Sequence, residues 1–370
     1  MSRVAWRRGV RCGLAVALGA GAVVAAAGCG GPGALSPGGA SAQVAPSPGA
    51  LSGRVGNGTA GGTGVVVDAE RGLVLTNSHV VVGLSSLRAR VGDDPSTEGP
   101  ARVVAKAPCE DLAVVQLVNV PEDLTEITFG SSADVESGQT VTALGYPASF
   151  ENPEDQKIVS TSGIVNSADV AAEPDPSLPK YASTIQHQAP INPGNSGGPL
   201  VNDKGELIGI NTLGNTEQGG RTIQGQYYAI SVDHVREFLP DLEAGKSTTD
   251  AGWDMSPVGN VALADIFAAD PDFASAETGQ AVEQQVGPEG VDGLYVWRSN
   301  TGSPAGEANI VFGDMVTSVE GTAVRSVSEV CDILASHAPG DTLEVKGRYL
   351  NSARDDDQLL AGWRAVITLE

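Results

Sequence analysis

Basic residues, cysteine and histidine are scarce in this 370-residue chain, and each shortage excludes a class of function. Only 22 lysines and arginines stand against 45 acidic residues, so a formal net charge of −23 would repel nucleic acids and anionic membrane surfaces. The four cysteines and four histidines form no cluster with metal-ligand spacing. We therefore expect no nucleic-acid partner, no metal and no other cofactor.

Aromatic residues are also few, at 4% of the chain, whereas glycine is abundant at 48 residues. Such a composition predicts many turns and short strands rather than long helices. A chain of this length has room for two globular domains, because one domain typically takes about 100–200 residues.

The N-terminal segment has the layout of an export signal. Residues 1–11 contain four arginines and no acid, residues 12–27 are apolar, and the small residues of AAGC at 26–29 follow. The apolar run is shorter than the roughly 20 residues that a membrane-spanning helix needs. The end of this segment is similar to a bacterial lipobox, although Ala26 stands where leucine is usual. We expect export and acylation of Cys29, with an uncleaved anchor or ordinary secretion as alternatives.

Short apolar runs follow a stretch rich in glycine, proline, serine and alanine. Residues 29–53 have too few large apolar groups to offset the entropy of ordering, so we expect a flexible linker there. From Thr63 onward the runs recur about every ten residues, which is typical of an antiparallel sandwich or a pair of barrels. We expect a hairpin at 64–67 and 73–75, a helix at 233–239, and further strands at 102–104, 112–117, 140–144, 158–159, 163–165, 207–212 and 227–230.

The C-terminal part has the pattern of a small α+β unit. Ser303-Pro304 offers an N-cap with proline at the first helical position. Ser326 and Glu329 form a capping box before an apolar helical face at 327–334. Strands are expected at 315–319, 343–345 and 365–367.

Cys109 and Cys331 lie in different predicted domains. An exported protein could join them in a disulfide. Two buried free thiols are the simpler interpretation, and we expect those.

The segment NPGNSGGPL at 192–200 raises the question of function, because Ser196 is surrounded by residues that free the backbone rather than pack a core. A tight loop entering a strand would explain the pattern. So would a nucleophilic serine, whose neighbouring amides must turn towards a developing oxyanion.

A nucleophilic serine needs a base and an acid that orients it. His79 follows a predicted strand in TNSHVV, and Asp111 opens the apolar run DLAVVQL. Taken singly, the histidine fits a turn or a core and the aspartate fits a solvated strand end. Of the other histidines, we expect His234 and His337 to be structural and His187 to line the nearby cleft.

Together these residues carry a family resemblance. The order His79, Asp111, Ser196 within TNSHVV, DLAVVQL and GNSGGPL resembles the trypsin-like serine proteases, in particular the bacterial HtrA/Deg group. The motifs VTALGYP, TSGIV, IGINTL and YAISVDHVREFL extend the resemblance over about residues 62–242, and GSPAGEANIVFGDMVTSVEGTAV is similar to the PDZ domain that usually follows. The resemblance implies a mostly β fold: a chymotrypsin-like double β-barrel of two six-stranded barrels, followed by a small α+β PDZ domain.

The same resemblance implies roles for individual residues. His79 would be the general base and then the acid, Asp111 would orient it, and Ser196 would be the nucleophile. The oxyanion hole would comprise Gly194, Asn195 and Ser196, and glycine makes the required backbone conformation accessible.

The specificity pocket would be formed by Pro190 at its base together with Ile210 and Asn211. Without an acid at position 190, we expect cleavage after small or medium apolar residues rather than after lysine or arginine. Asn195 stands where the digestive relatives have an aspartate that pairs with a newly cut N-terminus. We therefore expect control by loop ordering rather than by zymogen cleavage.

The prediction is an exported, lipid-anchored, ATP-independent serine endopeptidase acting on unfolded or damaged envelope proteins. Its expected partners are those polypeptides, a peptide ligand of the PDZ domain, and the membrane through the lipid anchor. Homotrimers occur in the family, but the N-terminal aromatic contacts that hold them are not apparent here. The PDZ loop that binds a peptide carboxylate is normally a short glycine-containing apolar motif, and we identify no such motif between residues 253 and 294. An alternative of another class is a catalytically weak chaperone or PDZ-mediated binding protein.

The sequence divides into five expected segments. They are an export signal at 1–28, a linker at 29–53, the protease domain at 54–245, a linker with the start of the PDZ domain at 246–289, and the PDZ domain at 290–370.

Overall fold

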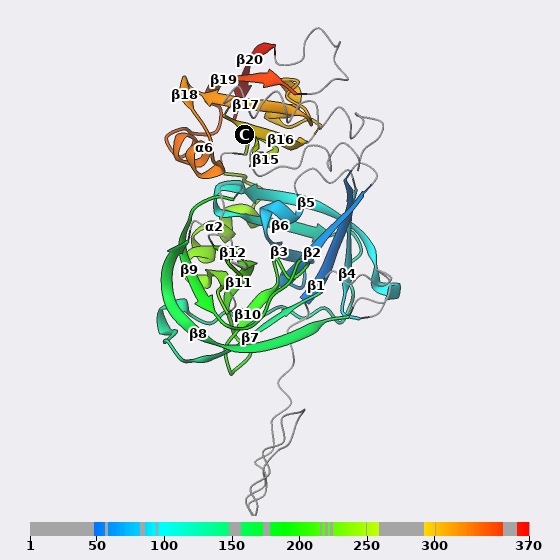
Figure 1. The fold of residues 1–370 in the computed structure, drawn as a ribbon. Coiled ribbons are helices and arrows are strands. Elements are labelled where there is room, and N and C mark those ends of the chain that lie inside the picture. Colours follow the sequence, from blue (N-terminus) through cyan, green and yellow to red (C-terminus); the bar gives the residue numbers. More distant parts are fainter. Residues whose placement is uncertain are drawn as a thin grey trace, which may run out of the picture. The chain divides into compact units, whose positions relative to one another are not determined.

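The chain divides into two units, Met1–Ala42 and Gln43–Glu370, and every residue described here belongs to the second. The computed structural model describes residues 48–55, 58–81, 86–93, 95–147, 157–172, 178–214, 217–218, 221–222, 225–248, 250–258, 292–299, 301–350 and 361–369. The strands form two closed barrels and an open sheet, which confirms the mostly β prediction (Figure 1). The predicted export signal and the lipidation site Cys29 lie outside the described residues.

The first barrel is built from six antiparallel strands in the order β1-β2-β3-β6-β5-β4 (blue to cyan in Figure 1). They are β1 (Pro48–Val55), β2 (Gly58–Asp68), β3 (Leu73–Thr76), β4 (Ser86–Val91), β5 (Gly99–Ala107) and β6 (Leu112–Leu117). The barrel closes because β1 pairs with both β2 and β4. The predicted linker is therefore too long at its C-terminal end. Residues 48–53 include one large apolar residue, Leu51, but β1 is paired with a strand on each side.

The second barrel also has six antiparallel strands, in the order β10-β11-β14-β9-β8-β7. They are β7 (Thr140–Gly145), β8 (Val159–Ala172), β9 (Tyr181–His187), β10 (Pro199–Val201), β11 (Leu207–Gly214) and β14 (Tyr227–Ser231). Two short strands of two residues each pair with one another outside the barrel sheet: β12 (Glu217–Gln218) and β13 (Arg221–Thr222).

One helix packs against both barrels. The predicted helix at 233–239 is α2, which spans Val232–Glu243. Its buried side chains Val235, Leu239 and Leu242 share a core with residues of both barrels. The shorter helical segments are α1 (Ser78–Val81), η1 (Pro95–Thr97), η2 (Pro108–Glu110) and η3 (Ser132–Asp134).

The C-terminal sheet has the strand order β15-β16-β17-β19-β20, with β18 paired to β17. Its elements are β15 (Trp253–Pro257), β16 (Leu294–Ser299), α5 (Pro304–Glu307), β17 (Asp314–Val319), β18 (Thr322–Ala323), α6 (Val327–Leu334), β19 (Thr342–Tyr349) and β20 (Gly362–Thr368). The capping box predicted at Ser326 is formed: its hydroxyl accepts from Glu329 N, and the Glu329 carboxylate accepts from Ser326 N. The edge strand β15 lies within residues 246–289, the segment expected to hold a linker and the start of the PDZ domain.

A disulfide joins Cys109, in η2, to Cys331, in α6, across 222 residues of sequence. The expectation of two free thiols was therefore wrong. Sequence spacing gave no reason to pair them, but the tertiary structure brings their Cα atoms to 5.5 Å, within the range that a disulfide bridges.

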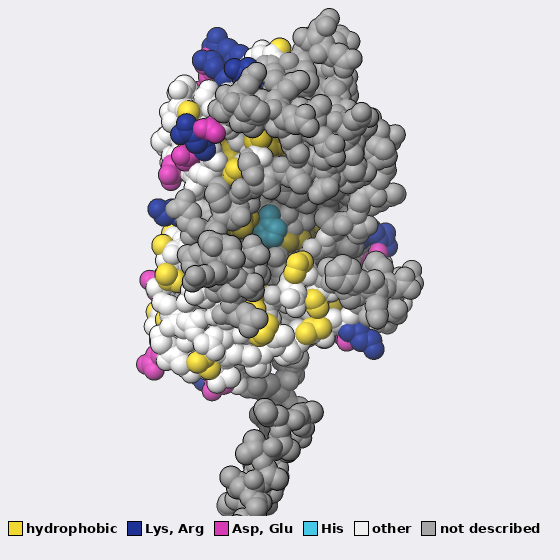
Figure 2. All heavy atoms as spheres, in the orientation of Figure 1, with side chains coloured by type: hydrophobic (Ala, Val, Ile, Leu, Met, Phe, Trp, Pro, Cys, Tyr) yellow, Lys and Arg dark blue, Asp and Glu magenta, His cyan; other side chains and the backbone are white. Residues whose placement is uncertain are grey.

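The visible surface is mixed in character. On the face shown in Figure 2, acidic and basic side chains lie near one another at the margins, and hydrophobic side chains form small groups between them. In the part of the chain that the structure describes, no helix has the length and apolar character needed to cross a membrane.

Candidate active site

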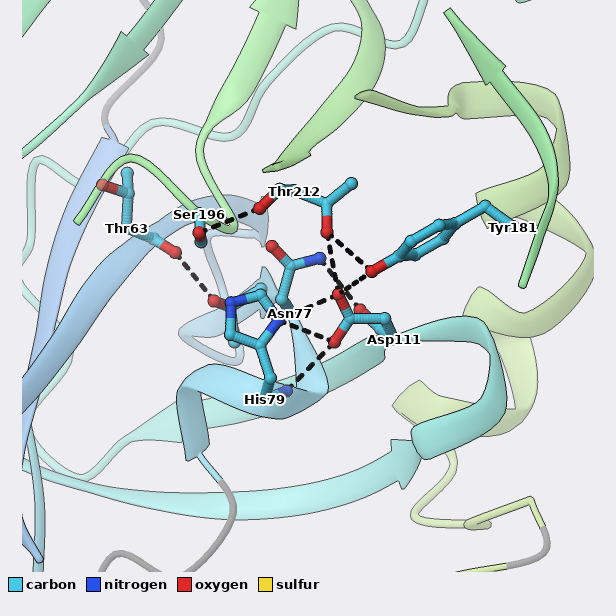
Figure 3. A network of polar contacts seen from close by, with 8 residues as sticks. Thr63, Asn77, His79, Asp111, Tyr181, Ser196 and Thr212 are labelled. Atoms are coloured by element: carbon cyan, nitrogen blue, oxygen red, sulfur yellow. Dashed lines mark hydrogen bonds and ion pairs between the residues drawn. The ribbon is translucent and has the colours of Figure 1, made fainter. Parts of the chain in front are cut away.

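His79 enters the site at the end of a fully buried strand. The apolar strand β3 ends at Thr76, and the short helix α1 then turns the chain so that His79 faces Asp111 (Figure 3). Asn77, which is fully buried, donates its side-chain amide to the Asp111 carbonyl at 2.9 Å. The segment that carries the histidine is thus fastened to the segment that carries the aspartate.

Asp111 lies between η2 and β6 and is only 2% exposed. Its backbone has φ 53° and ψ 40°, a left-handed conformation that is uncommon outside glycine and here ends the η2 turn. The Asp111 carboxylate accepts hydrogen bonds from His79 N at 3.0 Å and from His79 Nδ1 at 2.9 Å. A buried carboxylate needs such donors, because burying a charge without hydrogen-bond partners costs free energy.

Two more donors reach the Asp111 carboxylate from the second barrel. Tyr181 OH donates to Oδ2 at 3.0 Å and Thr212 Oγ1 donates to the same oxygen at 2.9 Å. Burial, and then the charge of Asp111, raises the pKa of the Tyr181 phenol well above its ordinary value of 10, so the phenol remains protonated and able to donate. Sequence reasoning gave neither residue a role. Thr212 stands in the IGINTL motif, whereas nothing local distinguishes Tyr181 from a core tyrosine.

Ser196 lies in the loop between β9 and β10, and its hydroxyl donates to the Thr212 carbonyl at 3.1 Å. The hydroxyl has a single proton, so in this conformation the proton is not directed at His79. The structure brings the three predicted residues into one network: His79 from the first barrel, Asp111 at the start of β6, and Ser196 beside β11 (Figure 3).

The backbone before Ser196 forms a tight turn. Asn195 N donates to Asn192 O at 2.9 Å, and Gly194 has φ +99°. Proline at the second position and glycine with positive φ at the third are the residues that a type II turn requires. Among the described residues, the amides of Gly194 and Ser196 have no hydrogen-bond partner, whereas the Asn195 amide is occupied. Of the three residues predicted for the oxyanion hole, two therefore offer an N–H group.

The residues predicted for the specificity pocket differ in accessibility. Pro190 is exposed, and its carbonyl accepts from Thr161 Oγ1 at 2.6 Å. Ile210 and Asn211 are completely buried. The Asn211 backbone exchanges 2.8 Å hydrogen bonds with the loop that carries Ser196: Asn211 N donates to Gly198 O, and Asn211 O accepts from Gly197 N. A surface role is therefore supported for Pro190 alone.

The remaining histidines lie away from this network. His187 does not line a cleft, as the sequence had suggested, because it is completely buried on β9 with neither ring nitrogen hydrogen-bonded within the described part. Burial lowers the pKa of His187 to about 4. The Ala189 backbone raises this pKa but offsets only part of the decrease. His234 bonds Glu110 at 2.6 Å, and this bond raises the His234 pKa. His337 Nδ1 contacts the Ile333 carbonyl at the end of α6.

An apolar cavity adjoins the histidine. His79, Pro108 and Leu178 line it from the barrel side, and Trp253 and Val330 line it from the C-terminal sheet and helix. The cavity also contacts both cysteines of the disulfide. In the described residues, no group of His, Cys, Asp and Glu side chains has the arrangement of a metal site.

Residues 62–210 match the trypsin-like peptidase domain family, and residues 275–357 match the PDZ domain family. The chain is HtrA-like. The serine protease Do-like HtrA of Bacillus subtilis is 32% identical over 290 residues, which are 77% of this chain and 60% of that protein. The putative serine protease HhoA of Synechocystis is 34% identical over 71% of this chain and 61% of its own length.

A probable periplasmic serine endoprotease DegP-like of Pseudomonas fluorescens is 30% identical over 71% of this chain and 48% of its own length. The HtrA-like chain thus spans about half to three-fifths of these curated relatives. A solved structure of the HtrA-type protease AlgW with a tripeptide is 24% identical and covers 88% of this chain and 94% of that one, with a TM-score of 0.48.

Proposed function

We propose that this HtrA-like protein is a serine endopeptidase in which Ser196 attacks the peptide carbonyl and His79 takes the serine proton, then returns it to the leaving amine. The observation that carries the proposal is the 2.9 Å hydrogen bond between His79 Nδ1 and the buried carboxylate of Asp111. This bond makes Nδ1 the protonated ring nitrogen of neutral His79 and leaves the basic lone pair on Nε2. When His79 accepts the serine proton, the Asp111 charge stabilises the imidazolium.

The oxyanion hole is proposed to consist of the Gly194 and Ser196 amides. Both are without a partner in the described residues, and the turn at 192–195 holds them in place before any substrate arrives. Donors that are fixed in advance stabilise the tetrahedral oxyanion without reorganising during the reaction. One such donor contributes about 3 kcal/mol to transition-state stabilisation.

The proposed substrates are unfolded or damaged polypeptides, cleaved without ATP as part of protein quality control. The names of the relatives support a protease, and the periplasmic relative supports export. Acylation of Cys29 would then anchor the protein to the outer face of the membrane. Pro190, exposed near the nucleophile loop, favours small or medium apolar residues on the acyl side of the cut bond.

The PDZ domain is proposed to bind a peptide between β15 and α6. β15 is an edge strand of the described sheet, paired only with β16, so a peptide can add to it as a further strand. Buried apolar side chains of both elements, including Met255 and Leu334, lie in one core.

The alternative of a catalytically weak binding protein is favoured by one observation. The Ser196 hydroxyl donates to Thr212 O, so it must rotate before His79 can take its proton. A protein that stayed in this state would bind polypeptides through its PDZ domain without cutting them.

The test is to incubate the purified protein with unfolded casein and to map new termini by mass spectrometry. Ser196→Ala should abolish cleavage. Ser183→Ala, which removes a β9 hydroxyl that donates to Asp169 on β8, should leave cleavage intact. Cuts after apolar residues would support the Pro190 pocket. Equal cleavage by the Ser196→Ala protein would show a contaminant, and absence of cleavage in every preparation would favour the binding protein.

A further inference from the structure

Thr63 lies directly behind the nucleophile loop, although nothing in the sequence marked it as more than the start of an apolar strand. It belongs to β2 in the first barrel and is completely buried. Every polar group of Thr63 has a partner, and those partners lie in three other segments of the chain.

The side chain of Thr63 bonds the turn that precedes Ser196. Its hydroxyl donates to the Gly194 carbonyl at 2.7 Å and accepts from Tyr146 N at 2.9 Å. A threonine hydroxyl has one proton and two lone pairs, so it can make both bonds at once. The Gly194 carbonyl is thereby tied to the chain that follows β7 of the second barrel.

The backbone of Thr63 forms hydrogen bonds to the segment that carries Ser196 and to the segment that leads to His79. Thr63 N donates to the Ser196 carbonyl at 2.8 Å. The Thr63 carbonyl accepts from Thr76 Oγ1 at 2.7 Å, and Thr76 ends the strand that leads to His79. One residue therefore links the nucleophile loop, the histidine segment and both barrels.

The packing around Thr63 leaves the loop little room to shift. A Cβ on Gly197 would lie 2.1 Å from Thr63 O, and Gly197 has φ +84°. A Cβ on Gly198 would lie 3.0 Å from Thr63 Cγ2. Glycine is needed at position 197 both for this close approach and for its backbone conformation.

We propose that Thr63 is a positioning residue for the reaction: its hydroxyl fixes the Gly194 carbonyl and its amide fixes the Ser196 carbonyl, which together hold the oxyanion-hole amides in place. The inference rests on the proposed function and deepens it. The Gly194 carbonyl belongs to the peptide unit after the Gly194 N–H group. That unit also contains the Asn195 N–H group. Its bonds to Thr63 and to Asn192 together fix the turn that contains Gly194.

The decisive comparison is Thr63→Val against Thr63→Ser. Valine keeps the shape but removes the hydroxyl, which leaves the Gly194 carbonyl and the Tyr146 amide buried without that partner. Serine keeps both bonds. Because loss of one oxyanion donor typically costs about 100- to 1,000-fold in kcat, misplacement of one by Thr63→Val should lower kcat by about 10- to 100-fold, with KM within about two-fold. Thr63→Ser should stay within about three-fold of the parent protein.

A control and an inhibitor separate positioning from simple destabilisation. Thr184→Val removes another buried hydroxyl, which bonds Val170 O in the second barrel, and should lower thermal stability without the loss in kcat. Affinity for a peptide boronate, which forms a tetrahedral adduct at the serine, should fall in Thr63→Val in proportion to kcat/KM. If Thr63→Val does not fold, Thr63→Ala carries the same comparison.

Hydrogen exchange provides a readout that does not depend on catalysis. In Thr63→Val the peptide covering residues 191–198 should exchange faster than in Thr63→Ser, even if the parent protein cuts nothing. Equal exchange in the two variants, or a kcat loss matched by Thr184→Val, would overturn the role of Thr63. If the parent protein cuts nothing and Thr63→Val still exchanges faster than Thr63→Ser, the positioning role of Thr63 is supported while the proposed function fails.

Discussion

Asp111 shows at the scale of one residue how the site is assembled. Its carboxylate accepts bonds from His79, Tyr181 and Thr212, so donors from both barrels meet on one buried charge. Tyrosine and threonine hydroxyls stabilise the ionised carboxylate, and His79 Nδ1 is held towards it.

Asp111→Asn should therefore lower kcat by about 10⁴-fold, as expected when an amide NH₂ group faces Nδ1 and favours the wrong histidine tautomer. Stability should change less, because the amide keeps the shape and most of the partners. Steady-state kinetics with unfolded casein or a peptide cut from it will measure the loss. A reduction of less than ten-fold would contradict the orienting role of Asp111.

His187 gives a second prediction at this scale, on acid stability. The unfolded histidine has a pKa of about 6.5, whereas burial lowers the folded pKa to about 4. Between these values the unfolded state binds the proton and the folded state does not. The contribution of His187 is therefore complete above pH 6.5 and is lost as the pH falls towards 4, by about 3 kcal/mol in total.

Denaturant unfolding at several pH values will test this dependence. Between pH 6.5 and 4, the free energy of unfolding should depend less steeply on pH in His187→Leu than in the parent protein, because the contribution of this residue is removed. An unaltered slope in His187→Leu would show that other groups control acid stability.

At the scale of the element, α6 begins with a reciprocal cap. The Ser326 hydroxyl accepts from Glu329 N, and the Glu329 carboxylate returns a bond to Ser326 N. Ser326→Ala should lower the free energy of unfolding of the PDZ domain by about 1 kcal/mol. Glu329→Gln should cost less, since its amide oxygen can still accept from the Ser326 amide.

Tryptophan fluorescence is a suitable measurement for the cap. Three of the four tryptophans, Trp253, Trp297 and Trp363, belong to strands of the C-terminal sheet, and the fourth is at position 6. The fluorescence transition in urea therefore reports chiefly on this sheet. An unchanged midpoint in Ser326→Ala would show that the cap adds nothing to its stability.

At the scale of the whole molecule, the Cys109–Cys331 disulfide ties the η2 turn to α6. It closes a loop of 222 residues, for which chain entropy gives an upper value of about 5 kcal/mol. Cys109 is two residues before Asp111, so the same bond also restricts the backbone that leads to Asp111.

Reduction should therefore lower the thermal midpoint of the parent protein. A Cys109→Ser/Cys331→Ser double variant should start at that lower midpoint and not respond to reductant. Scanning calorimetry with and without reductant will measure both. A parent protein whose midpoint is indifferent to reduction would exclude a stabilising role for the disulfide.

The sequence by itself predicted many of the elements from local marks, whereas His79, Asp111 and Ser196 were singled out together by their resemblance to a protease family. Alternation of short apolar runs with turn residues predicted strands such as β3, β6, β7 and β14 but not β4 or β9. The capping box predicted α6 because its two partners lie three residues apart. The glycines around Ser196 marked its loop as unusual, since close backbone approach excludes a Cβ at Gly197. These signals depend on neighbours in the chain and need no knowledge of the fold.

Tertiary structure alone decided which residues support those groups. Tyr181 and Thr63 have no local signature, because most of their hydrogen-bond partners come from segments far away in the sequence. Glycine-rich residues 48–53 form a strand because neighbouring strands pair their backbone, and the two cysteines bond because the fold brings their Cα atoms together. Long-range hydrogen bonds and covalent links depend on three-dimensional proximity, which spacing along the chain does not encode.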